Sequence, residues 1–595
     1  MLLIVHRMRH SLTLFIPLLL WLSPKGAQAQ TLNFADISSK SGINSWGTHS
    51  GVAFADYDSD GDQDIYVTTL NEEPNLLYRN NGNGTFTEVG EACGVRYVGG
   101  TLTSVFGDIN NDGHPDLYLG NSRAANTLYL NNGDGTFTDI TATAYVGDQG
   151  QARSVNMADV NGDGWLDIYV ANLADENNLY LNQGDNTFID VVFAAGVTDP
   201  RVSMGAIFFD YDNDGDQDLY LSHDANQPNI LYQNNGTGSF TDVSEASGAN
   251  YAGFGMGVDV ADYNNDGWLD IYITNLNENA LLKNNGDGTF TERGGEAGIA
   301  DLGMGWGTAW FDYDNDGFTD LYMVNDSDFS DFANILYRNL GDGSFAEVSK
   351  DSPLYSHYGA YGTAVADIDN DGRMDIFVAN KSSRHNELFL NETSPANNWL
   401  RLQLQGTSSN ADAVGARVRL YSAGTLLCMD EISAGSGYAG QNEKTLHFGL
   451  GSMDQVDSLV IRWPAGLVES YTHLEANHLY TAIESGSIEK AEMTEPGEDP
   501  TLVTGIGDLI GSEESVYLFP NPGKATIYLS AKPLLGTVIH CQLFHVNGRL
   551  MREQKQQVQT GNIDLSTWLH DLEAGTYLLK IEGQDETITL PLILR

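Results

Sequence analysis

Cysteine and positive charge are both scarce in this sequence of 595 residues. The three cysteines, Cys93, Cys428 and Cys541, lie in what look like three different domains and give no disulfide framework. Lysine and arginine number 29 against 81 aspartates and glutamates, so the formal net charge is −52. A field this acidic makes nucleic acid and anionic membranes poor partners. Stability must therefore come from a core, which 41% apolar residues can build, and from metal.

Long hydrophobic runs are missing beyond the N-terminus. Residues 1–29 contain Arg7 and Arg9, an apolar stretch from about Leu12 to Leu22, and an Ala-Gln-Ala site that ends at Ala29. This order predicts a secretory signal peptide. A membrane anchor is the alternative, but the apolar stretch is short for a bilayer span. Since no later stretch could cross a bilayer, we expect no transmembrane span.

Aspartate, in contrast, is abundant and regularly spaced. The stretch "DYDSDGDQD" (56–64) places carboxylates at positions 1, 3, 5 and 9, with Gly61 at position 6 for a sharp turn. Position 7 can add its main-chain carbonyl. Hard oxygen ligands in this number suit Ca²⁺ better than the stricter octahedron of Mg²⁺. The flanks "GVAFA" and "IYVTT" indicate strands rather than EF-hand helices, so we predict a calcium loop inside a β-hairpin.

This pattern occurs seven times, at intervals of 50 to 55 residues, always with glycine at position 6. A solvated acidic turn would explain one copy but hardly seven. We therefore predict up to seven Ca²⁺ ions, one per repeat, as the cofactor. Position 3 is asparagine in three loops, which keeps the oxygen but loses a charge. The predicted metal-site residues, at positions 1, 3, 5, 7 and 9 of each loop, are Asp56, Asp58, Asp60, Asp62, Asp64; Asp108, Asn110, Asp112, His114, Asp116; Asp159, Asn161, Asp163, Trp165, Asp167; Asp210, Asp212, Asp214, Asp216, Asp218; Asp262, Asn264, Asp266, Trp268, Asp270; Asp312, Asp314, Asp316, Phe318, Asp320; and Asp367, Asp369, Asp371, Arg373, Asp375.

Each repeat contains four short strand-like segments, which is the content of a β-propeller blade. The seventh repeat lacks its fourth strand, while "LNFADISSKSGI" (32–43) matches "GTFTEVGEACGV" (84–95) of the first repeat. We therefore predict a seven-bladed propeller over residues 31–394, in which residues 31–43 complete the last blade and remove its open edge.

The repeats resemble the FG-GAP/VCBS family of calcium-binding blades, the propeller type of integrin α chains. That resemblance implies that each loop binds calcium through its own Asp or Asn at positions 1, 3 and 5 and its Asp at position 9. Residues 395–485, with "LRLQLQ", "ARVRLY" and "TLHFGLG", resemble the ASPIC/UnbV domain that follows such propellers in proteins of the cartilage acidic protein type. His447 in this block is expected to be structural.

The C-terminal part has a different composition. Residues 486–514 are rich in Gly, Pro and acidic residues and are predicted to be a linker. Residues 515–595, with "VYLFPNP" and "LEAGTYLLKI", resemble the β-sandwich sorting domain of type IX secretion cargo. The resemblance implies export by the type IX machinery, to the medium or the outer-membrane surface of a Gram-negative bacterium. The fold class expected for the whole chain is all-β.

The strand connections divide between two faces of the predicted propeller. The calcium loops and the Asn/Gly turns share one face, and the remaining connections share the other. The latter vary most, and we expect them to bind the ligand. They offer Arg123, Arg153, His223, Trp306, His357, Tyr358, Arg384 and His385.

Catalytic motifs are missing as well. The sequence has no G-x-S-x-G elbow, no H-E-x-x-H and no phosphate-binding loop. We therefore expect no enzyme, but a secreted or cell-surface binding or adhesion module for an extracellular protein or glycan. The alternative is a calcium-stabilised carbohydrate-active enzyme, a polysaccharide lyase or hydrolase, which would need a carboxylate pair with one raised pKa in a cleft.

Overall fold

The computed structural model describes residues 32–43, 45–394 and 397–491, together with seven strands between residues 517 and 594. The chain forms two compact units, Met1–Gly497 and Glu498–Arg595. The predicted signal peptide and most of the predicted linker lie outside the described residues. Within the described part, none of the helices has the length and apolar character needed to span a bilayer.

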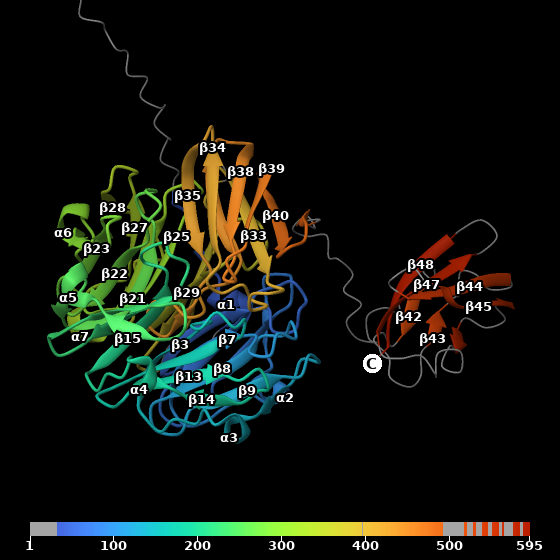
Figure 1. The fold of residues 1–595 in the computed structure, drawn as a ribbon, viewed down its shortest axis with the longest axis horizontal. Helices are drawn as coiled ribbons and strands as arrows, with labels where there is room; N and C mark the ends of the chain where they lie inside the picture. Colours follow the sequence, from blue (N-terminus) through green and yellow to red (C-terminus); the bar gives the residue numbers. More distant parts are fainter. Residues whose placement is uncertain are drawn as a thin grey trace, which may run out of the picture. The chain divides into compact units, whose positions relative to one another are not determined.

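Seven four-stranded antiparallel units make up most of the first unit (Figure 1), and we number these blades from one to seven along the chain. The innermost strands are β3 (His49–Ala55), β7 (Thr101–Gly107), β11 (Ala152–Ala158), β15 (Ser203–Phe209), β21 (Gly255–Ala261), β25 (Gly305–Phe311) and β29 (Ala360–Ala366). The second strands are β4 (Asp64–Thr69), β8 (Asp116–Asn121), β12 (Asp167–Asn172), β16 (Asp218–His223), β22 (Asp270–Asn275), β26 (Asp320–Asn325) and β30 (Asp375–Asn380).

The outer half of each blade is shorter. The third strands are β5 (Leu76–Asn80), β9 (Thr127–Asn131), β13 (Asn178–Asn182), β18 (Ile230–Asn234), β23 (Ala280–Asn284), β27 (Ile335–Asn339) and β32 (Glu387–Asn391). The fourth strands are β6 (Phe86–Glu88), β10 (Phe137–Asp139), β14 (Phe188–Asp190), β19 (Phe240–Asp242), β24 (Phe290–Glu292), β28 (Phe345–Glu347) and β1 (Phe34–Asp36). One-turn helices follow the fourth strands of six blades: α1 (Ser38–Ser41), α2 (Gly90–Cys93), α3 (Thr141–Ala144), α4 (Val192–Ala195), α5 (Ser244–Ser247) and α6 (Gly294–Ala297). The connections also contain a further short helix, α7 (Ser327–Ser330), and four two-residue strands. Of these strands, β2 (Trp46–Gly47) pairs with β31 (Arg384–His385), and β17 (Gln227–Pro228) pairs with β20 (Ala252–Gly253).

The blades form a closed ring. Each innermost strand contacts the innermost strands of both neighbouring blades, and β29 of blade seven contacts β3 of blade one. These strands and the second strands are buried almost along their whole length, because a neighbouring blade covers each of their faces. The buried apolar runs of the sequence are the consequence. The predicted all-β propeller is thus the fold of this unit.

The N-terminal segment supplies the fourth strand of blade seven. Phe34 of β1 pairs with Asn391 of β32, and the Ile37 amide donates to the Leu388 carbonyl at 2.9 Å. Phe34 is buried among residues of blades six and seven. Two segments about 350 residues apart in the chain therefore lie side by side and leave β32 with a partner on its outer edge.

A second domain, residues 398–490, is built from two four-stranded sheets. One contains β33 (Asn398–Gln405), β37 (Leu446–Gly451), β40 (His478–Ile483) and β41 (Ile488–Lys490), and the other contains β34 (Arg417–Ser422), β35 (Thr425–Glu431), β38 (Gln455–Arg462) and β39 (Val468–Glu475). Because β41 pairs with β40, the domain extends past residue 485 and the linker predicted from residue 486 begins later. The reason is local: Ile488 continues the apolar alternation across the turn.

The second domain sends one loop into the ring. Residues 433–441, here called the axial loop, include β36 (Gly440–Gln441), which joins β3 in parallel. The innermost strands of blades one, three and five donate to this loop, from Val52 to Ala439 at 3.0 Å, from Met157 to Ala434 at 3.0 Å and from Val258 to Gly437 at 3.2 Å. The centre of the ring is therefore filled by backbone that comes from outside the propeller repeats.

The described residues of the second unit form strands as well. One sheet contains β42 (Tyr517–Phe519), β43 (Tyr528–Ser530) and β46 (Asn562–Asp564), and the other contains β44 (Val538–His545), β45 (Leu550–Gln557), β47 (Gly575–Glu582) and β48 (Thr587–Leu594). All pairings are antiparallel. Two antiparallel sheets are the composition expected of the predicted β-sandwich.

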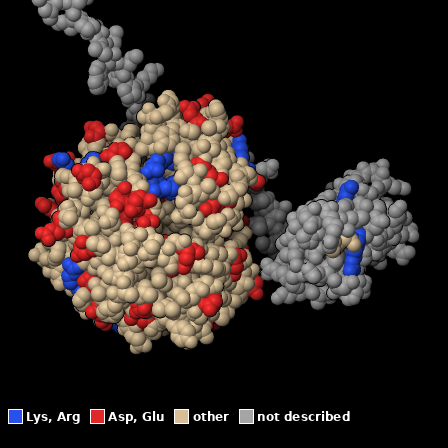
Figure 2. All heavy atoms as spheres, viewed as in Figure 1, with Lys and Arg blue, Asp and Glu red and all other residues tan. Residues whose placement is uncertain are grey.

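The surface is as acidic as the composition implies. On the face displayed in Figure 2, carboxylates are spread widely over the first unit and basic groups occur in a few small clusters. The basic residues are therefore informative wherever they gather.

Candidate metal centres

The seven aspartate loops share one hydrogen-bonding scheme. In every loop the carboxylate at position 1 accepts from the backbone amides of positions 5 and 6, at 2.7–3.1 Å. The backbone amide of position 7 in turn donates to the carboxylate of position 5, as His114 does to Asp112 at 3.0 Å. These bonds wrap the loop around its own acidic side chains.

Two positions of each loop require the left-handed backbone region. Position 6 is glycine with φ between 82° and 111°, and position 4 has φ between 54° and 71°. Asparagine tolerates this region better than most residues. Position 4 is accordingly Asn111, Asn213, Asn265, Asn315 or Asn370 in five loops, and Ser59 or Gly162 in the others.

The position-4 asparagines also tie neighbouring loops together. Asn111, for example, donates to the carbonyl of Gly164 in the next loop at 2.9 Å. Three further loops repeat this bond, and Asn370 of loop seven donates to Asp62 of loop one at 3.1 Å. This role was not predicted, although asparagine recurs at position 4 of five loops.

A second set of asparagines, at the last residue of each third strand, holds position 9. Their backbone amides donate to the carboxylate of position 9 at 2.6–2.8 Å. Their side chains donate at 2.7–2.9 Å to the carbonyl of position 2 in the preceding blade. These residues are Asn80, Asn131, Asn182, Asn234, Asn284, Asn339 and Asn391. The same side chain therefore joins two blades and orients a predicted ligand.

In four loops the structure gathers three carboxylates with oxygens within 4.8 Å of one another. The groups are Asp56, Asp58 and Asp64; Asp210, Asp212 and Asp218; Asp312, Asp314 and Asp316; and Asp367, Asp369 and Asp371. These are the four loops with aspartate at all four predicted ligand positions. The first two groups omit position 5 (Asp60, Asp214), and the last two omit position 9 (Asp320, Asp375).

In the other three loops, position 3 is asparagine. Asn110 and Asn161 donate to the aspartates at position 5, each at 2.9 Å, and Asn264 donates to Asp270 at 3.3 Å. An amide donor lowers the repulsion between carboxylates. These loops therefore hold one negative charge less and have some compensation of their own.

The clustered aspartates are held in an environment that resists their ionisation. Burial, and then the neighbouring carboxylates, raise the pKa of Asp58 to about 6 and that of Asp371 to about 7. Burial raises the pKa of Asp116 to about 8. Asp58 Oδ1 and Asp369 Oδ1 are buried and accept no hydrogen bond from the described residues. Buried carboxylate oxygens without donors need a cation, and oxygen-only donor sets of this kind fit Ca²⁺.

Position 7 contributes differently from the carboxylate positions. The side chains of His114, Trp165, Trp268 and Phe318 pack against glycines of the turns between third and fourth strands, where any added Cβ would collide with them. In these four loops position 7 thus has only its main-chain carbonyl to offer to a metal. The same contacts put these turns on the face of the aspartate loops.

Basic side chains reach some of the loops. Arg338, on β27, lies 3.0 Å from Asp314 and 2.7 Å from Asp316, and Lys283, on β23, lies 2.8 Å from Asp266. Loops two and three have Leu130 and Leu181 at the same place in the third strand. The loops thus differ in internal cations as well as in their number of aspartates.

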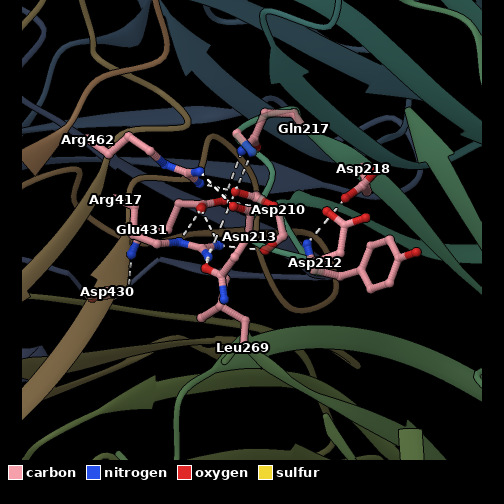
Figure 3. Close-up of polar contacts among 12 residues, drawn as sticks. Asp210, Asp212, Asn213, Gln217, Asp218, Leu269, Arg417, Asp430, Glu431 and Arg462 are labelled. Carbon is pink, nitrogen blue, oxygen red and sulfur yellow. Dashed lines mark hydrogen bonds and ion pairs between the residues drawn. The ribbon is translucent and has the colours of Figure 1, made fainter. Parts of the chain in front are cut away.

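The second domain covers the aspartate loops with buried arginines. Arg401 pairs with Asp367 at 2.7 Å and with Glu443 at 2.6 Å. Figure 3 shows Arg417 and Arg462 converging on Asp210 of loop four; Arg417 donates to the Asp210 carbonyl at 2.6 Å and Arg462 pairs with its carboxylate. The alternation in "LRLQLQ" and "ARVRLY" predicted half-buried strands, but not that their arginines would face another domain.

The predicted ligand-binding residues divide into two groups. Arg123, Arg153 and Trp306 line one cavity on the face opposite the aspartate loops. His223 does not belong to this surface: it is fully buried, and its Nε2 lies 2.8 Å from Asp199. That expectation was wrong, because the last residue of β16 points into the protein. His447, which was expected to be structural, is half-buried, with Nε2 3.1 Å from the Gly372 carbonyl.

The remaining four residues are near blade seven. Tyr358 lies beneath the guanidinium of Arg384 at 4.7 Å and beside the ring of His385 at 5.6 Å. The ring of Trp46, which is 73% exposed, lies 5.7 Å from that of His385 and is tilted against it by 33°. His357 lies next to them in sequence and packs on Tyr355. These residues form an exposed aromatic cluster, so the face carries more than one feature suited to binding.

Comparison with family models gives three matches. FG-GAP-like repeats match residues 56–119, 108–170, 159–221, 210–273, 262–323 and 312–378, each beginning at position 1 of an aspartate loop. The ASPIC and UnbV domain matches residues 406–489. A secretion system C-terminal sorting domain matches residues 517–595.

Sequence relatives match about 70% of this chain. Cartilage acidic protein 1 of Xenopus tropicalis is 28% identical over 467 residues, which is 70% of this chain and 70% of that protein. The protein of the same name from Homo sapiens is 28% identical over 471 residues, with 71% and 69% covered. Among solved structures, an Agrocybe aegerita lectin described as recognising non-reducing terminal N-acetylglucosamine is 21% identical, with 55% of this chain and 87% of that chain covered and a TM-score of 0.34. A TM-score this low carries no argument about function.

Proposed function

Because the chain belongs to the FG-GAP-like repeat family, we propose that it is a calcium-stabilised binding module that works outside the cell. The C-terminal match to a secretion sorting domain supports export through the type IX machinery to the medium or the outer-membrane surface. The N-terminal signal sequence would provide the first step of that route. The aspartate loops would hold the calcium, and the ring would present the ligand-binding face.

Calcium is proposed as a structural ion. The observation that carries this is the pair of buried oxygens, Asp58 Oδ1 and Asp369 Oδ1, that lack donors among the described residues inside aspartate clusters. An ion at each loop would neutralise carboxylates that burial otherwise protonates. Up to seven ions are proposed, one per loop.

The free face of the ring is proposed as the binding surface for an extracellular protein or glycan. The second domain covers the aspartate-loop face through Arg401, Arg417 and Arg462. The opposite face carries the exposed aromatic cluster around Trp46 and the cavity that Arg123 and Arg153 line. We propose that binding there is non-catalytic, since most carboxylates with raised pKa values lie at the metal loops or at the covered interface. The exception, Glu387, is buried and accepts hydrogen bonds from Ser356 and Asn380.

The test of the calcium proposal is a count of ions. Asp58→Ala should remove about one bound calcium in equilibrium dialysis and lower the melting temperature in calcium. Calcium that binds only the folded state raises stability by linkage, so chelator should lower the melting temperature of the parent protein. Asp287→Ala, in an exposed turn of blade five, is the matched control and should change neither quantity. A purified protein without calcium, whose melting ignores both calcium and chelator, would refute the proposal.

The binding role is tested separately. An array of glycans and matrix proteins should give a ligand whose binding is weakened by Trp46→Ala or Arg384→Ala. Asp342→Ala, on the opposite face, should leave it unchanged. Turnover of a polysaccharide by the purified chain would instead favour a carbohydrate-active enzyme.

A further inference from the structure

A cavity of about 640 Å³ lies on the axis of the ring, at the end remote from the aspartate loops. All seven blades contribute to its wall. Innermost strands begin there with Leu102, Met204 and Met256, and the second strand of blade three ends beside Leu173. The volume is in the range of sites for small organic molecules, and the wall is mostly apolar, as such sites are.

The axial loop closes the cavity at its inner end. Tyr438, at the tip of this loop, is only 1% exposed and packs edge-on against Trp306 with ring centroids 4.7 Å apart. Trp306 makes the same kind of contact with Tyr361 at 4.6 Å. The cavity therefore has an aromatic floor and a single open end, on the face that the second domain leaves free.

Two arginines of the wall have no counter-ion. Among the described residues, neither Arg123 nor Arg153 forms an ion pair, although the chain carries a net charge of −52. Arg153 is half-buried, and its Nε is buried without a hydrogen-bond acceptor in the described part of the chain. At the aspartate loops, by contrast, buried arginines are paired with carboxylates, as Arg401 is.

The charge of the wall favours an anion. Asp224 is the one acidic residue among the described lining, against two arginines, and its carboxylate accepts from the Ala225 amide at 2.6 Å. Arg153 hydrogen-bonds the Tyr438 side chain, but its buried Nε–H has no acceptor among the described residues. Such an unsatisfied donor is costly unless a ligand supplies an acceptor, and a carboxylate matches the geometry of a guanidinium. The apolar wall offers few polar groups for the many hydroxyls of a sugar.

We propose that this cavity binds a carboxylate carried by an apolar or aromatic body, with the carboxylate at Arg153 and the body against Trp306 and the methionines. Arg123, at the exposed rim, adds a second positive charge. Such a group could be a free organic acid or the C-terminal residue of a peptide. The inference rests on the proposed binding face and specifies the chemistry recognised at its centre.

The experiment compares an acid with its uncharged isostere on the full exported chain in calcium. In isothermal titration, 2-naphthoate should bind at least ten-fold more tightly than 2-naphthamide. Arg153→Gln should remove most of that difference and leave the amide's affinity unchanged, and Arg153→Lys should keep part of it, since it keeps the charge. Arg96→Gln, which changes an exposed arginine that pairs with Glu91 outside the cavity, is the matched control and should bind both probes as the parent does.

A second arm separates the two sources of the carboxylate. A tripeptide ending in phenylalanine is compared with its C-terminal amide; selective binding of the free acid supports a chain end, and binding of naphthoate alone supports a small organic acid. Equal affinity for acid and amide, or parent-like binding by a folded Arg153→Gln protein, would overturn the inference. If the carboxylate site fails this test but the protein still binds a ligand on the glycan and protein array, the proposed binding function stands. The failure of the cavity proposal can thus be distinguished from a failure of the proposed function.

Discussion

At the scale of single residues, cations inside the protein compete for the same carboxylates as calcium. Loops one, four, six and seven have four ligand aspartates and would be ranked as the tighter sites on charge alone. Loop six, however, already has Arg338 against Asp314 and Asp316. The number of aspartates in a loop therefore does not by itself determine its affinity for calcium.

Arg338→Leu tests this point with the residue type that loops two and three have at the same place. Removing the guanidinium should strengthen calcium binding at loop six by several-fold, because calcium no longer competes with a side-chain cation for the carboxylates. The same change should lower stability in chelator, since the clustered carboxylates of Asp312, Asp314 and Asp316 then repel one another without compensation. Calcium titration followed by isotope exchange or calorimetry measures the first effect, and melting in chelator the second.

The control for Arg338→Leu is Arg293→Leu, which removes an exposed arginine paired with Glu296. It should alter neither calcium binding nor melting by much, because exposed pairs contribute little. If the two variants take up calcium identically, the guanidinium does not compete for the site.

At the scale of elements, the N-terminal strand β1 closes the ring. Phe34→Ala removes a buried aromatic side chain from the contact between β1 and β32 and should cost about 3–5 kcal/mol of unfolding free energy. Deletion of residues 32–43 should cost more, because it also exposes the outer edge of β32. Urea denaturation measures both, and Ser39→Ala in the same segment should melt like the parent. A deletion variant with unchanged denaturation would contradict the closure.

Elements also show where sequence reasoning succeeds and where it stops. The blades and loops were predictable because each repeat carries its own pattern: glycine at position 6, an apolar second strand, an Asn/Gly turn. The bonds from Asn131 or Asn182 to another blade were not, since the recurring asparagine is visible in the sequence but its acceptor is about 74 residues away. His223 was misread because strand alternation does not reveal the buried Asp199 beside it.

The axial loop and the arginines of the second domain lay beyond prediction for a similar reason. Arg417 looks like an ordinary polar position in an alternating strand, yet it is fully buried at the ring. Its environment is set by the way two domains pack, and a single sequence contains no periodic trace of that packing. The candidate metal loops could thus be read from the sequence, whereas the cavity on the axis could not.

At the scale of the whole molecule, the aspartates make stability depend on both pH and calcium. Burial raises the pKa of Asp56 and Asp58 to about 6, and that of Asp116 to about 8, above the value near 4 of an unfolded chain. Between roughly pH 4 and 8 the folded chain therefore binds more protons than the unfolded chain, and its stability falls as pH rises. Calcium binds the ionised carboxylates, so the stabilisation that it provides increases as pH rises.

We expect the melting temperature to depend on pH more steeply in chelator than in calcium. In chelator, the melting temperature should fall between pH 5 and pH 8. In excess calcium the fall should be much smaller, so the stabilisation by calcium grows with pH. Scanning calorimetry at several pH values measures both, and parallel slopes in the two conditions would show that these carboxylates are not the calcium ligands.

The axial loop finally makes the centre of the ring depend on a later part of the chain. The innermost strands of blades one, three and five bond to residues 434–439, which follow all seven repeats in the sequence. A ring formed earlier thus offers unpaired amides at Val52, Met157 and Val258 along its axis until the second domain folds. Both ends of the loop belong to that domain, so it enters as a closed bend and no chain end has to be threaded. The backbone amides at the centre of the ring therefore find their acceptors only in a segment of the same chain that lies outside the repeats.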